Sequence, residues 1–267
     1  MGSPLRLPAE DLSSKYALDL DETRAALESF DGGDVLLLAF SGKIGAGKDS
    51  VAPKTFAHFD RGSLRVESDS FGADLKIELN GLIRAIQDSA GVRRSAREIA
   101  GSYGVTLEEA THVVGLIHDE IQSGVLKSAY DRTQGSRAAL QYWATEVRRN
   151  QDSLYWVKPV IRRTVRSAIQ GVSTQITDVR FFTEAWGAID IGGWTVRLDV
   201  TEAEQRRRIL ERDGIEISEA AKAHSSETEL DSFEHFAVRI QTDNYSSTDA
   251  VALAAANGVA SVASTLF

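Results

Sequence analysis

The chain has 267 residues, of which 42% are hydrophobic and 26% charged, a composition typical of soluble globular proteins. Its length allows one large domain or a core domain with a sizeable insertion. The formal net charge of −9 argues against nucleic-acid binding over the whole surface, and the absence of cysteine excludes disulfides, thiolate zinc sites and cysteine nucleophiles.

The first half of the chain begins with a charged segment, 10–30, which we expect to form a helix within an N-terminal helical extension over 1–33. The apolar run VLLLAF, 35–40, predicts a strand buried on both faces of a parallel sheet. A glycine-rich stretch follows directly, and SVAPKTFAHF continues as a helix that tolerates Pro53 if this residue falls in its first turn. SLRVES, 63–68, predicts a second strand.

The second half adds a mainly helical middle, about 74–170, and two more buried strands, VSTQITDVRF (172–181) and WTVRLDV (194–200). TEAEQRRRILERDG predicts a helix that starts with a capping box of Thr201 and Glu204 and stops at Gly214. The tail from 233 is mixed, with Gly258 before a last strand or helix. Strands separated by helices predict an α/β fold with a mainly parallel central sheet.

The stretch SGKIGAGKDS fits the phosphate-loop pattern G-x-x-x-x-G-K through Gly42, Gly47 and Lys48. Glycines let successive backbone N–H groups converge on an anion, and the next helix adds its positive end. Lys48 can then reach the β- and γ-phosphates of a nucleotide. The residues predicted to hold the phosphates are Gly42, Ile44, Gly45, Ala46, Gly47, Lys48, Asp49 and Ser50.

Asp49 stands where such loops usually carry Ser or Thr. A carboxylate beside a polyphosphate is repelled unless a cation lies between them, so Asp49 is a candidate magnesium ligand, directly or through water. Alternatively, Ser50 supplies the oxygen ligand, or Asp49 only caps the helix.

Asp178 lies near the end of an apolar strand, where phosphate-loop proteins keep the acidic residue that holds the water shell of magnesium. A turn or cap residue is the alternative interpretation. Arg180, two residues on, projects to the same face and is a candidate for gripping an acceptor phosphate; the alternative is a surface ion pair.

Two basic segments stand out in this acidic chain. Residues 137–166 interleave arginines with aromatic side chains, which suits phosphate recognition and base stacking, although most such residues belong to ordinary helix surface and core. On the helix after Thr201, Arg208 and Arg212 share a face and are candidates for closing over the polyphosphate; a solvated basic face is the alternative. Residues 96–114 also hint at a helix-turn-helix around Gly104.

Taken together, the ordered motifs SGKIGAGKDS, FGADLK, LQYWATEVRR, DSLYWV, TDVRF and HSSETELD resemble a bacteriophage-type deoxynucleoside monophosphate kinase of the P-loop kinase-like family. The resemblance covers most of 36–244, and G-K-D in the loop recurs in that family. It implies a three-layer kinase fold over 34–267. Its core would span about 34–73 and 171–267, with a helical nucleotide-binding region at about 74–170 and a lid at about 204–230.

The resemblance also implies a reaction, the transfer of the γ-phosphoryl group of ATP to a deoxynucleoside monophosphate with Mg²⁺ as cofactor. Catalytic roles fall to Lys48, Arg180, Arg208 and Arg212. Magnesium would be held by Asp49, Ser50 and Asp178. The monophosphate pocket would be lined by Lys76, Arg137, Gln141, Trp143, Glu146, Arg149, Trp156 and Arg180, with one of the tryptophans against the base.

The expected setting is the cytoplasm, that of the host if the protein is phage-encoded, because no segment reads as a signal peptide or a membrane span of about 20 apolar residues. We expect no nucleic-acid or membrane partner; a homodimer is allowed but not required. Three rival functions remain. One is an ATP-dependent kinase of another small acceptor, and another is a nucleotide-gated DNA-binding regulator that reads DNA with 96–114. The third is a nucleotide-binding protein without transfer activity.

Overall fold

The centre of the fold is a parallel β-sheet. In the part of the chain that the computed structural model describes, 6–33, 35–59, 64–89, 91–131, 133–214 and 222–265, the sheet has five strands in the order β2-β3-β1-β4-β5. Every neighbouring pair is parallel. The expected α/β fold with a parallel sheet is confirmed. The strands are β1 (Leu37–Ser41), β2 (Arg65–Asp69), β3 (Val172–Val179), β4 (Trp194–Asp199) and β5 (Val238–Gln241).

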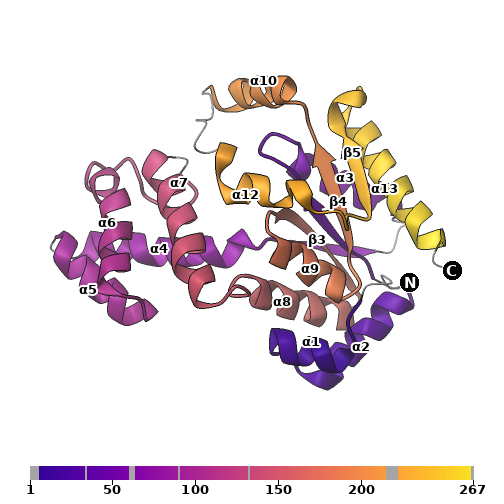
Figure 1. The fold of residues 1–267 in the computed structure, drawn as a ribbon, viewed down its shortest axis with the longest axis horizontal. Coiled ribbons are helices and arrows are strands. Elements are labelled where there is room, and N and C mark those ends of the chain that lie inside the picture. Colours follow the sequence, from indigo (N-terminus) through magenta and orange to yellow (C-terminus); the bar gives the residue numbers. More distant parts are fainter. Residues whose placement is uncertain are drawn as a thin grey trace. The chain divides into compact units, whose positions relative to one another are not determined.

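The chain divides into two compact units, one of Met1–Phe71 with Val157–Phe267 and one of Gly72–Trp156. In the first unit, α3 and α13 pack together on one face of the sheet, and α8 and α9 cover the other (Figure 1). Helices α1 and α2 pack outside α8. The helices that the structure describes in this unit are α1 (Ala9–Tyr16), α2 (Leu20–Asp31), α3 (Lys48–Phe59), α8 (Val157–Ile169), α9 (Phe182–Asp190), α10 (Glu202–Asp213), α12 (Ser225–Thr228) and α13 (Thr248–Thr265), with short 3-10 turns η2 (Glu229–Ser232) and η3 (Thr242–Asn244).

The apolar run that predicted β1 is buried along the whole strand, because helices lie on both faces of the sheet. Leu38 and Phe40 belong to the core formed with α3 and α13. The last helix, α13, contains Gly258 rather than following it. A Cβ atom at Gly258 would lie 2.8 Å from Cγ1 of Val238, so the glycine lets α13 approach β5 closely.

The predicted helix over 10–30 is in fact two helices. Ala17 ends α1 with a φ of 54°, and Asp19 starts α2 by accepting a hydrogen bond from the backbone N–H of Glu22 at 2.9 Å. Pro53 lies beyond the first turn of α3, where it removes the N–H that would pair with the carbonyl of Asp49.

The predicted capping box at the start of α10 is wrong. The side chain of Thr201 makes no cap bond. Its backbone N–H donates to Oδ2 of Asp243 at 3.4 Å, and the carboxylate of Glu204 binds Arg207 and Arg208. The stop at Gly214 is confirmed, with a φ of 69°.

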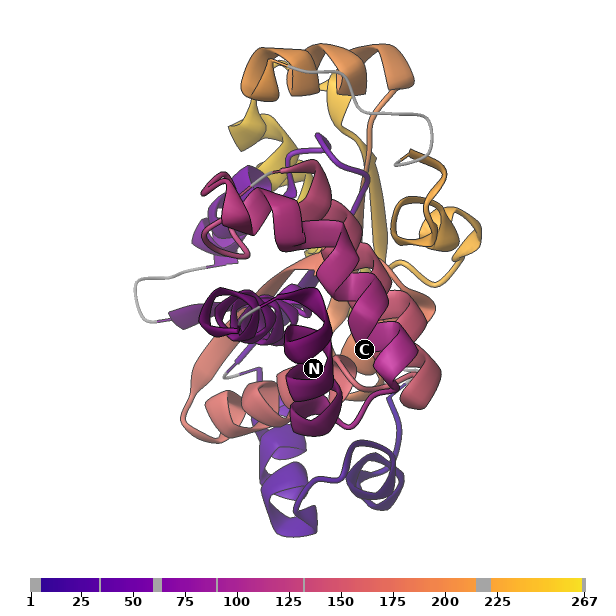
Figure 2. The same cartoon turned by 90° about the vertical axis from the view of Figure 1, so that its left-hand side faces the viewer.

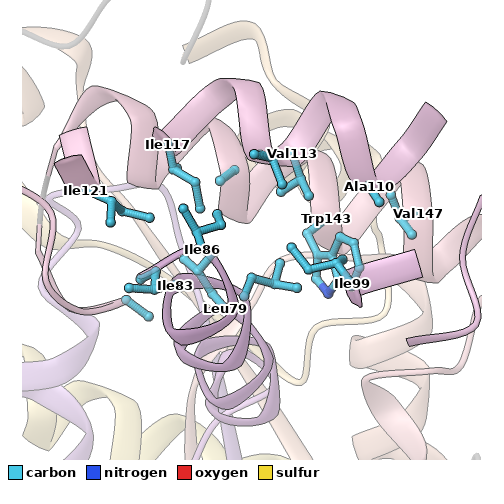
Figure 3. Close-up of a cluster of buried hydrophobic side chains, with 14 of the residues drawn as sticks. Leu79, Ile83, Ile86, Ile99, Ala110, Val113, Ile117, Ile121, Trp143 and Val147 are labelled. Carbon is cyan, nitrogen blue, oxygen red and sulfur yellow. The ribbon is translucent and has the colours of Figure 1, made fainter. Parts of the chain in front are cut away.

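The second unit is a helical bundle, as predicted for the middle of the chain. Its central helix, α6 (Leu107–Gln122), contacts α4 (Gly72–Asp88), α5 (Val92–Tyr103) and α7 (Gln134–Gln141), and a π-helix, η1 (Tyr142–Arg149), continues α7 (Figure 2). Ile83, Ile86 and Ile117 lie in its core (Figure 3). The unit ends at Trp156, so α8 packs against β3 in the first unit rather than with the bundle.

Among the helices that the structure describes, none combines the length and the apolar character needed to cross a membrane.

Candidate functional site

The predicted phosphate loop lies at the carboxyl edge of the sheet. It follows β1, which is paired with β3 on one side and β4 on the other. Because all strands are parallel, Asp178 and Arg180 at the end of β3 and Asp199 at the end of β4 reach the same edge. In open α/β sheets this edge is where ligands bind.

The loop has the backbone shape that its glycines predict. Gly42, Gly45 and Gly47 all have positive φ angles. At Gly42 a Cβ atom would lie 2.5 Å from the carbonyl oxygen of Leu198, so only glycine fits beside β4. Helix α3 begins at Lys48, so the loop leads straight into the positive end of a helix dipole.

Lys48 is buried and folds back over its own loop. Its Nζ atom donates to the carbonyl oxygens of Gly42 at 2.5 Å and Lys43 at 3.1 Å. Burial, helped by the nearby Arg180, lowers the pKa of Lys48 to about 8, while the carboxylates of Glu227, Asp49 and Asp178 oppose this shift. The charges of these groups therefore interact electrostatically with that of Lys48.

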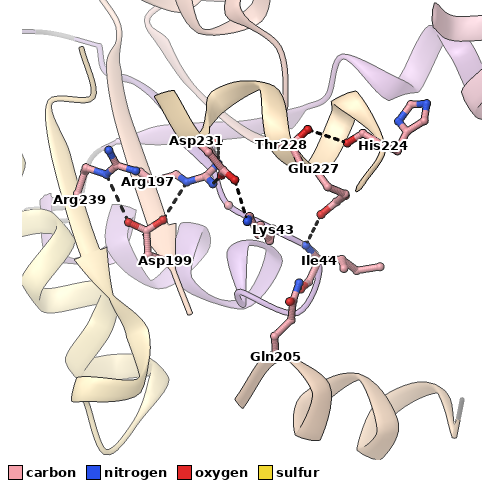
Figure 4. Close-up of polar contacts among 12 residues, drawn as sticks. Lys43, Ile44, Arg197, Asp199, Gln205, His224, Glu227, Thr228, Asp231 and Arg239 are labelled. Carbon is pink, nitrogen blue, oxygen red and sulfur yellow. Dashed lines mark hydrogen bonds and ion pairs between the residues drawn. The ribbon is translucent and has the colours of Figure 1, made fainter. Parts of the chain in front are cut away.

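A carboxylate from the last third of the chain reaches the same loop. Oε2 of Glu227 accepts a hydrogen bond from the backbone N–H of Ile44 at 2.9 Å (Figure 4). Its other oxygen, Oε1, forms an ion pair with Arg180. Arg180, which was expected either to grip a phosphate or to form a surface ion pair, thus has Glu227 as its partner. Glu227 lies in the motif HSSETELD, but no local pattern in the sequence predicts a role for it.

A second ionic network flanks the loop. Arg197, buried on β4, donates to Asp199 at 3.0 Å and to Asp231 at 2.7 Å, and its Nη1 atom donates to the hydroxyl of Ser41 at 3.0 Å. Asp231 also pairs with Lys43 of the loop at 2.8 Å (Figure 4). These contacts fix the start of the loop relative to β4.

Helix α10 packs against the loop from another side. Nε2 of Gln205 donates to the carbonyl oxygen of Ile44 at 2.8 Å, and Nη1 of Arg208 donates to the carbonyl oxygen of Gly45 at 3.3 Å. Nε of Arg208 pairs with Glu204 at 2.8 Å. Arg208 therefore contacts the loop backbone, whereas Arg212 is exposed one turn later. Of the predicted lid at 204–230, residues 215–221 lie outside the described residues.

The predicted magnesium ligands supply oxygen atoms near Lys48. Asp49 and Ser50 are exposed in the first turn of α3, and Oδ1 of Asp178 accepts from the backbone N–H of Phe71 at 2.9 Å. Among the residues described, no group of three or more acidic or histidine side chains gathers to hold a metal alone. This donor set fits Mg²⁺, which is usually bound by one or two carboxylates together with water and substrate phosphates.

The two tryptophans expected to stack on a base belong to the core of the second unit. Trp143 and Trp156 are fully buried, and Nε1 of Trp156 donates to the carbonyl of Ala144 at 3.2 Å. Nε1 of Trp143 donates to Glu78 at 2.6 Å. Both rings are therefore part of the hydrophobic core of the bundle, as the alternative interpretation of this segment expected, and neither is placed to stack on a base.

Glu78 is the polar centre of this bundle. Its carboxylate also accepts from Nε of Arg148 at 2.9 Å and from the hydroxyl of Tyr155 at 2.5 Å. The buried guanidinium of Arg148 lies 4.9 Å from the ring centroid of Trp143 and 4.8 Å from that of Tyr155. Tryptophan, arginine and tyrosine thus share one carboxylate, a network that the sequence did not reveal.

The other predicted pocket residues are also in the second unit. Lys76 lies on α4 with its Nζ atom 5.4 Å from the ring centroid of Tyr130. The remaining four share the continuous helical stretch α7–η1, whose π-helical part is a rare geometry frequent at functional sites. They are Arg137, Gln141, Glu146 and Arg149.

The segment 96–114, which suggested a helix-turn-helix, forms the end of α5 and the start of α6. Gly104 ends α5 with a φ of 64°, and Thr106 starts α6 with a capping box to Glu109. Glu108 and Glu109 give the first turn of α6 a negative charge, which is unfavourable beside a DNA phosphate backbone.

No protein-family model matches this chain, and a search of curated proteins finds no match. Function is therefore inferred from the chemistry of the site and from the motifs.

Proposed function

We propose that this protein transfers the γ-phosphoryl group of ATP to a deoxynucleoside monophosphate, giving the diphosphate and ADP. The observation that carries the proposal is the position of buried Lys48 in a glycine-rich loop beside Asp178 and Arg180 from the neighbouring strand. Phosphoryl transfer uses cationic side chains to neutralise phosphate charge and a carboxylate to hold magnesium, and this edge of the sheet carries groups of both kinds.

Within the α/β class, we propose that the chain has a P-loop kinase-like three-layer fold. A phosphate loop on the central strand, helices on both faces of an all-parallel sheet and a helical bundle inserted between β2 and β3 support this assignment. In this interpretation the bundle is the nucleotide-binding region, and α10 belongs to the lid side of the site.

On the donor side, the loop N–H groups from Ile44 to Ser50 and the start of α3 hold the phosphates of ATP. When ATP binds, the Nζ atom of Lys48 exchanges the carbonyl oxygen of Gly42 for a phosphoryl oxygen. The negative phosphate then stabilises the lysine charge, which burial disfavours in the free protein. Arg208 supports the loop through the carbonyl of Gly45.

Asp49, Ser50 and Asp178 are the residues that would hold magnesium, directly or through water. When bound, the ion neutralises charge on the β- and γ-phosphate oxygens. The backbone N–H of Phe71 orients Asp178 by donating to its Oδ1 atom.

On the acceptor side, the phosphate of a nucleoside monophosphate is ionised at neutral pH, so no strong general base is required. Catalysis then depends on positioning and on charge neutralisation by Lys48, Arg180 and magnesium. The choice of a deoxynucleotide as acceptor rests on the motif resemblance, with Lys76, Arg137 and Arg149 as candidate phosphate ligands.

The test is a screen of acceptors. ADP production from MgATP is measured without acceptor and with dAMP, dCMP, dGMP, dTMP and their ribose counterparts. We expect one or more deoxynucleotides to raise turnover well above the acceptor-free rate, and Lys48→Ala to abolish it. Stimulation by a different small acceptor alone would instead identify a kinase of another class. A lack of response to all acceptors, combined with salt-dependent DNA binding, would favour the regulator.

A further inference from the structure

The phosphate loop of this protein already binds an anion that belongs to its own chain. Glu227 presents one carboxylate oxygen to the N–H of Ile44, 2.9 Å away, and the other to the guanidinium of Arg180. A loop N–H group and an arginine are the two kinds of donor that proteins use for phosphoryl oxygens. The side chain of Glu227 is only 9% exposed, so this contact is enclosed and not a loose surface pair.

The segment that carries Glu227 is fixed to the strand ends by further carboxylates. We call residues 224–232 the acidic clasp. Glu229 accepts from the backbone N–H of Phe182 at 2.8 Å, and Asp231 pairs with Lys43 and Arg197 (Figure 4). At its start, Nδ1 of His224 accepts from the N–H of Ser226 at 3.2 Å. The two carboxylates that follow Glu227 therefore anchor the clasp beside the loop, and the His224–Ser226 bond orders its first turn.

A single N–H group cannot serve a carboxylate and a phosphoryl oxygen at once, and two anions within hydrogen-bond distance of each other repel strongly where water is excluded. A polyphosphate that enters the loop must therefore take the place of the Glu227 carboxylate at Ile44. The displaced carboxylate and the incoming phosphate then compete for the guanidinium of Arg180.

We propose that Glu227 is an internal ligand of the phosphate loop, occupying an anion subsite made by the N–H of Ile44 and the guanidinium of Arg180, and that a nucleotide phosphate binds by displacing it. This inference rests on the proposed function in that it assigns a polyphosphate to the loop. Displacement of Glu227 breaks its ion pair with Arg180, so the guanidinium becomes available to a phosphoryl oxygen. Nucleotide binding to the loop and release of Arg180 are therefore coupled. In the free protein, Glu227 keeps the loop in its binding shape and lowers its apparent affinity.

The experiment measures equilibrium binding of MgATP and MgADP to the full chain by calorimetry. Glu227→Gln keeps the size of the side chain but removes the charge that competes with phosphate. We expect it to bind MgATP about tenfold more tightly than the wild type. The matched control is Glu229→Gln, which removes a charge from the same clasp at a carboxylate that contacts Phe182 and not the loop. It should bind like the wild type.

The outcomes separate this inference from the proposed function. If the wild type binds MgATP, Lys48→Ala does not, and Glu227→Gln binds no more tightly than the wild type, the internal ligand is refuted while the kinase proposal stands. Equal tightening by both glutamine variants would also refute it, since net charge would then explain the effect. A complete lack of nucleotide binding in every variant would refute both proposals.

A second measurement needs no variant. Amide hydrogen exchange of the wild type is followed with and without MgATP. Displacement of Glu227 predicts faster exchange in the acidic clasp and slower exchange at Ile44 when nucleotide is bound. Unchanged or slower exchange in the clasp under saturating nucleotide would contradict the proposal.

Discussion

Lys48 and Gly42 close the glycine-rich loop on itself, since the Nζ atom of the lysine donates to the carbonyl oxygen of the glycine at 2.5 Å. The lysine is buried, and burial lowers its pKa to about 8. The protein therefore holds a cation in a place that disfavours its charge, as expected of a group that is stabilised by a ligand rather than by the fold.

The first prediction concerns stability. A lowering of the Lys48 pKa from 10.5 to about 8 corresponds to a cost on the order of 3 kcal/mol while the side chain is charged. Lys48→Met removes this cost, so we expect the variant to be more stable than the wild type at pH 7 by up to about 3 kcal/mol. Urea unfolding at pH 7 measures the difference.

The same prediction fixes a pH dependence. Between pH 8 and 10.5 the unfolded chain keeps the Lys48 proton and the folded chain has lost it, so wild-type stability rises with pH in this window. The advantage of Lys48→Met should be full below pH 8 and shrink above it. Lys54→Met on the same helix is the control, because Lys54 forms an exposed pair with Asp249. A pH-independent gain for Lys48→Met would show that desolvation of the lysine is not its cause.

The second prediction concerns magnesium. Asp178→Asn keeps an oxygen for the N–H of Phe71 but removes a charge from the predicted metal side. We expect kcat for phosphoryl transfer to fall by about a hundredfold or more, while metal-free ADP binds as before. Turnover across a magnesium series, together with calorimetry of ADP without metal, separates the two effects. If turnover and metal-free ADP binding fell by the same factor, Asp178 would be needed for the shape of the nucleotide site and not for magnesium.

The third prediction concerns the second unit. Glu78→Leu leaves the buried guanidinium of Arg148 without its carboxylate, which we expect to destabilise the protein by about 3–5 kcal/mol. The double variant Glu78→Leu with Arg148→Met removes both charges and should recover part of that loss. Urea unfolding followed by tryptophan fluorescence is the measurement. A double variant as unstable as Glu78→Leu would show that the ion pair is not the source of the loss.

How much the sequence predicts depends on how local each interaction is. The strand 35–40, the loop after it and the stop at Gly214 follow from apolar runs and glycines within a few residues, and the structure has them. Glu227 and Ile44 are 183 positions apart, so no local pattern reveals their contact. The break at Ala17 was missed because a non-glycine residue adopts the left-handed conformation there. Trp143 was assigned to the monophosphate pocket, yet its indole N–H donates to Glu78, 65 positions earlier, in the core of the bundle.

The fourth prediction concerns the N-terminal helices. The hydroxyl of Tyr16 and Nζ of Lys15 both donate to Oδ2 of Asp190, and burial together with this carboxylate raises the pKa of Tyr16. Tyr16→Phe removes a hydrogen bond to a buried charge, which we expect to lower the free energy of unfolding by about 2 kcal/mol. Tyr130→Phe, whose side chain is exposed, is the control and should change stability by less than about 0.5 kcal/mol. Equal stabilities of the two variants would contradict a role for Asp190 in fixing α1.

The most direct test of the account follows the phosphoryl group itself. ATP labelled in its γ-phosphoryl group is incubated with magnesium, the protein and each deoxynucleoside monophosphate, and the products are separated. We expect the label to appear in a deoxynucleoside diphosphate with the wild type and not with Lys48→Ala. Label found only in inorganic phosphate, or remaining in ATP with every acceptor, would contradict the account.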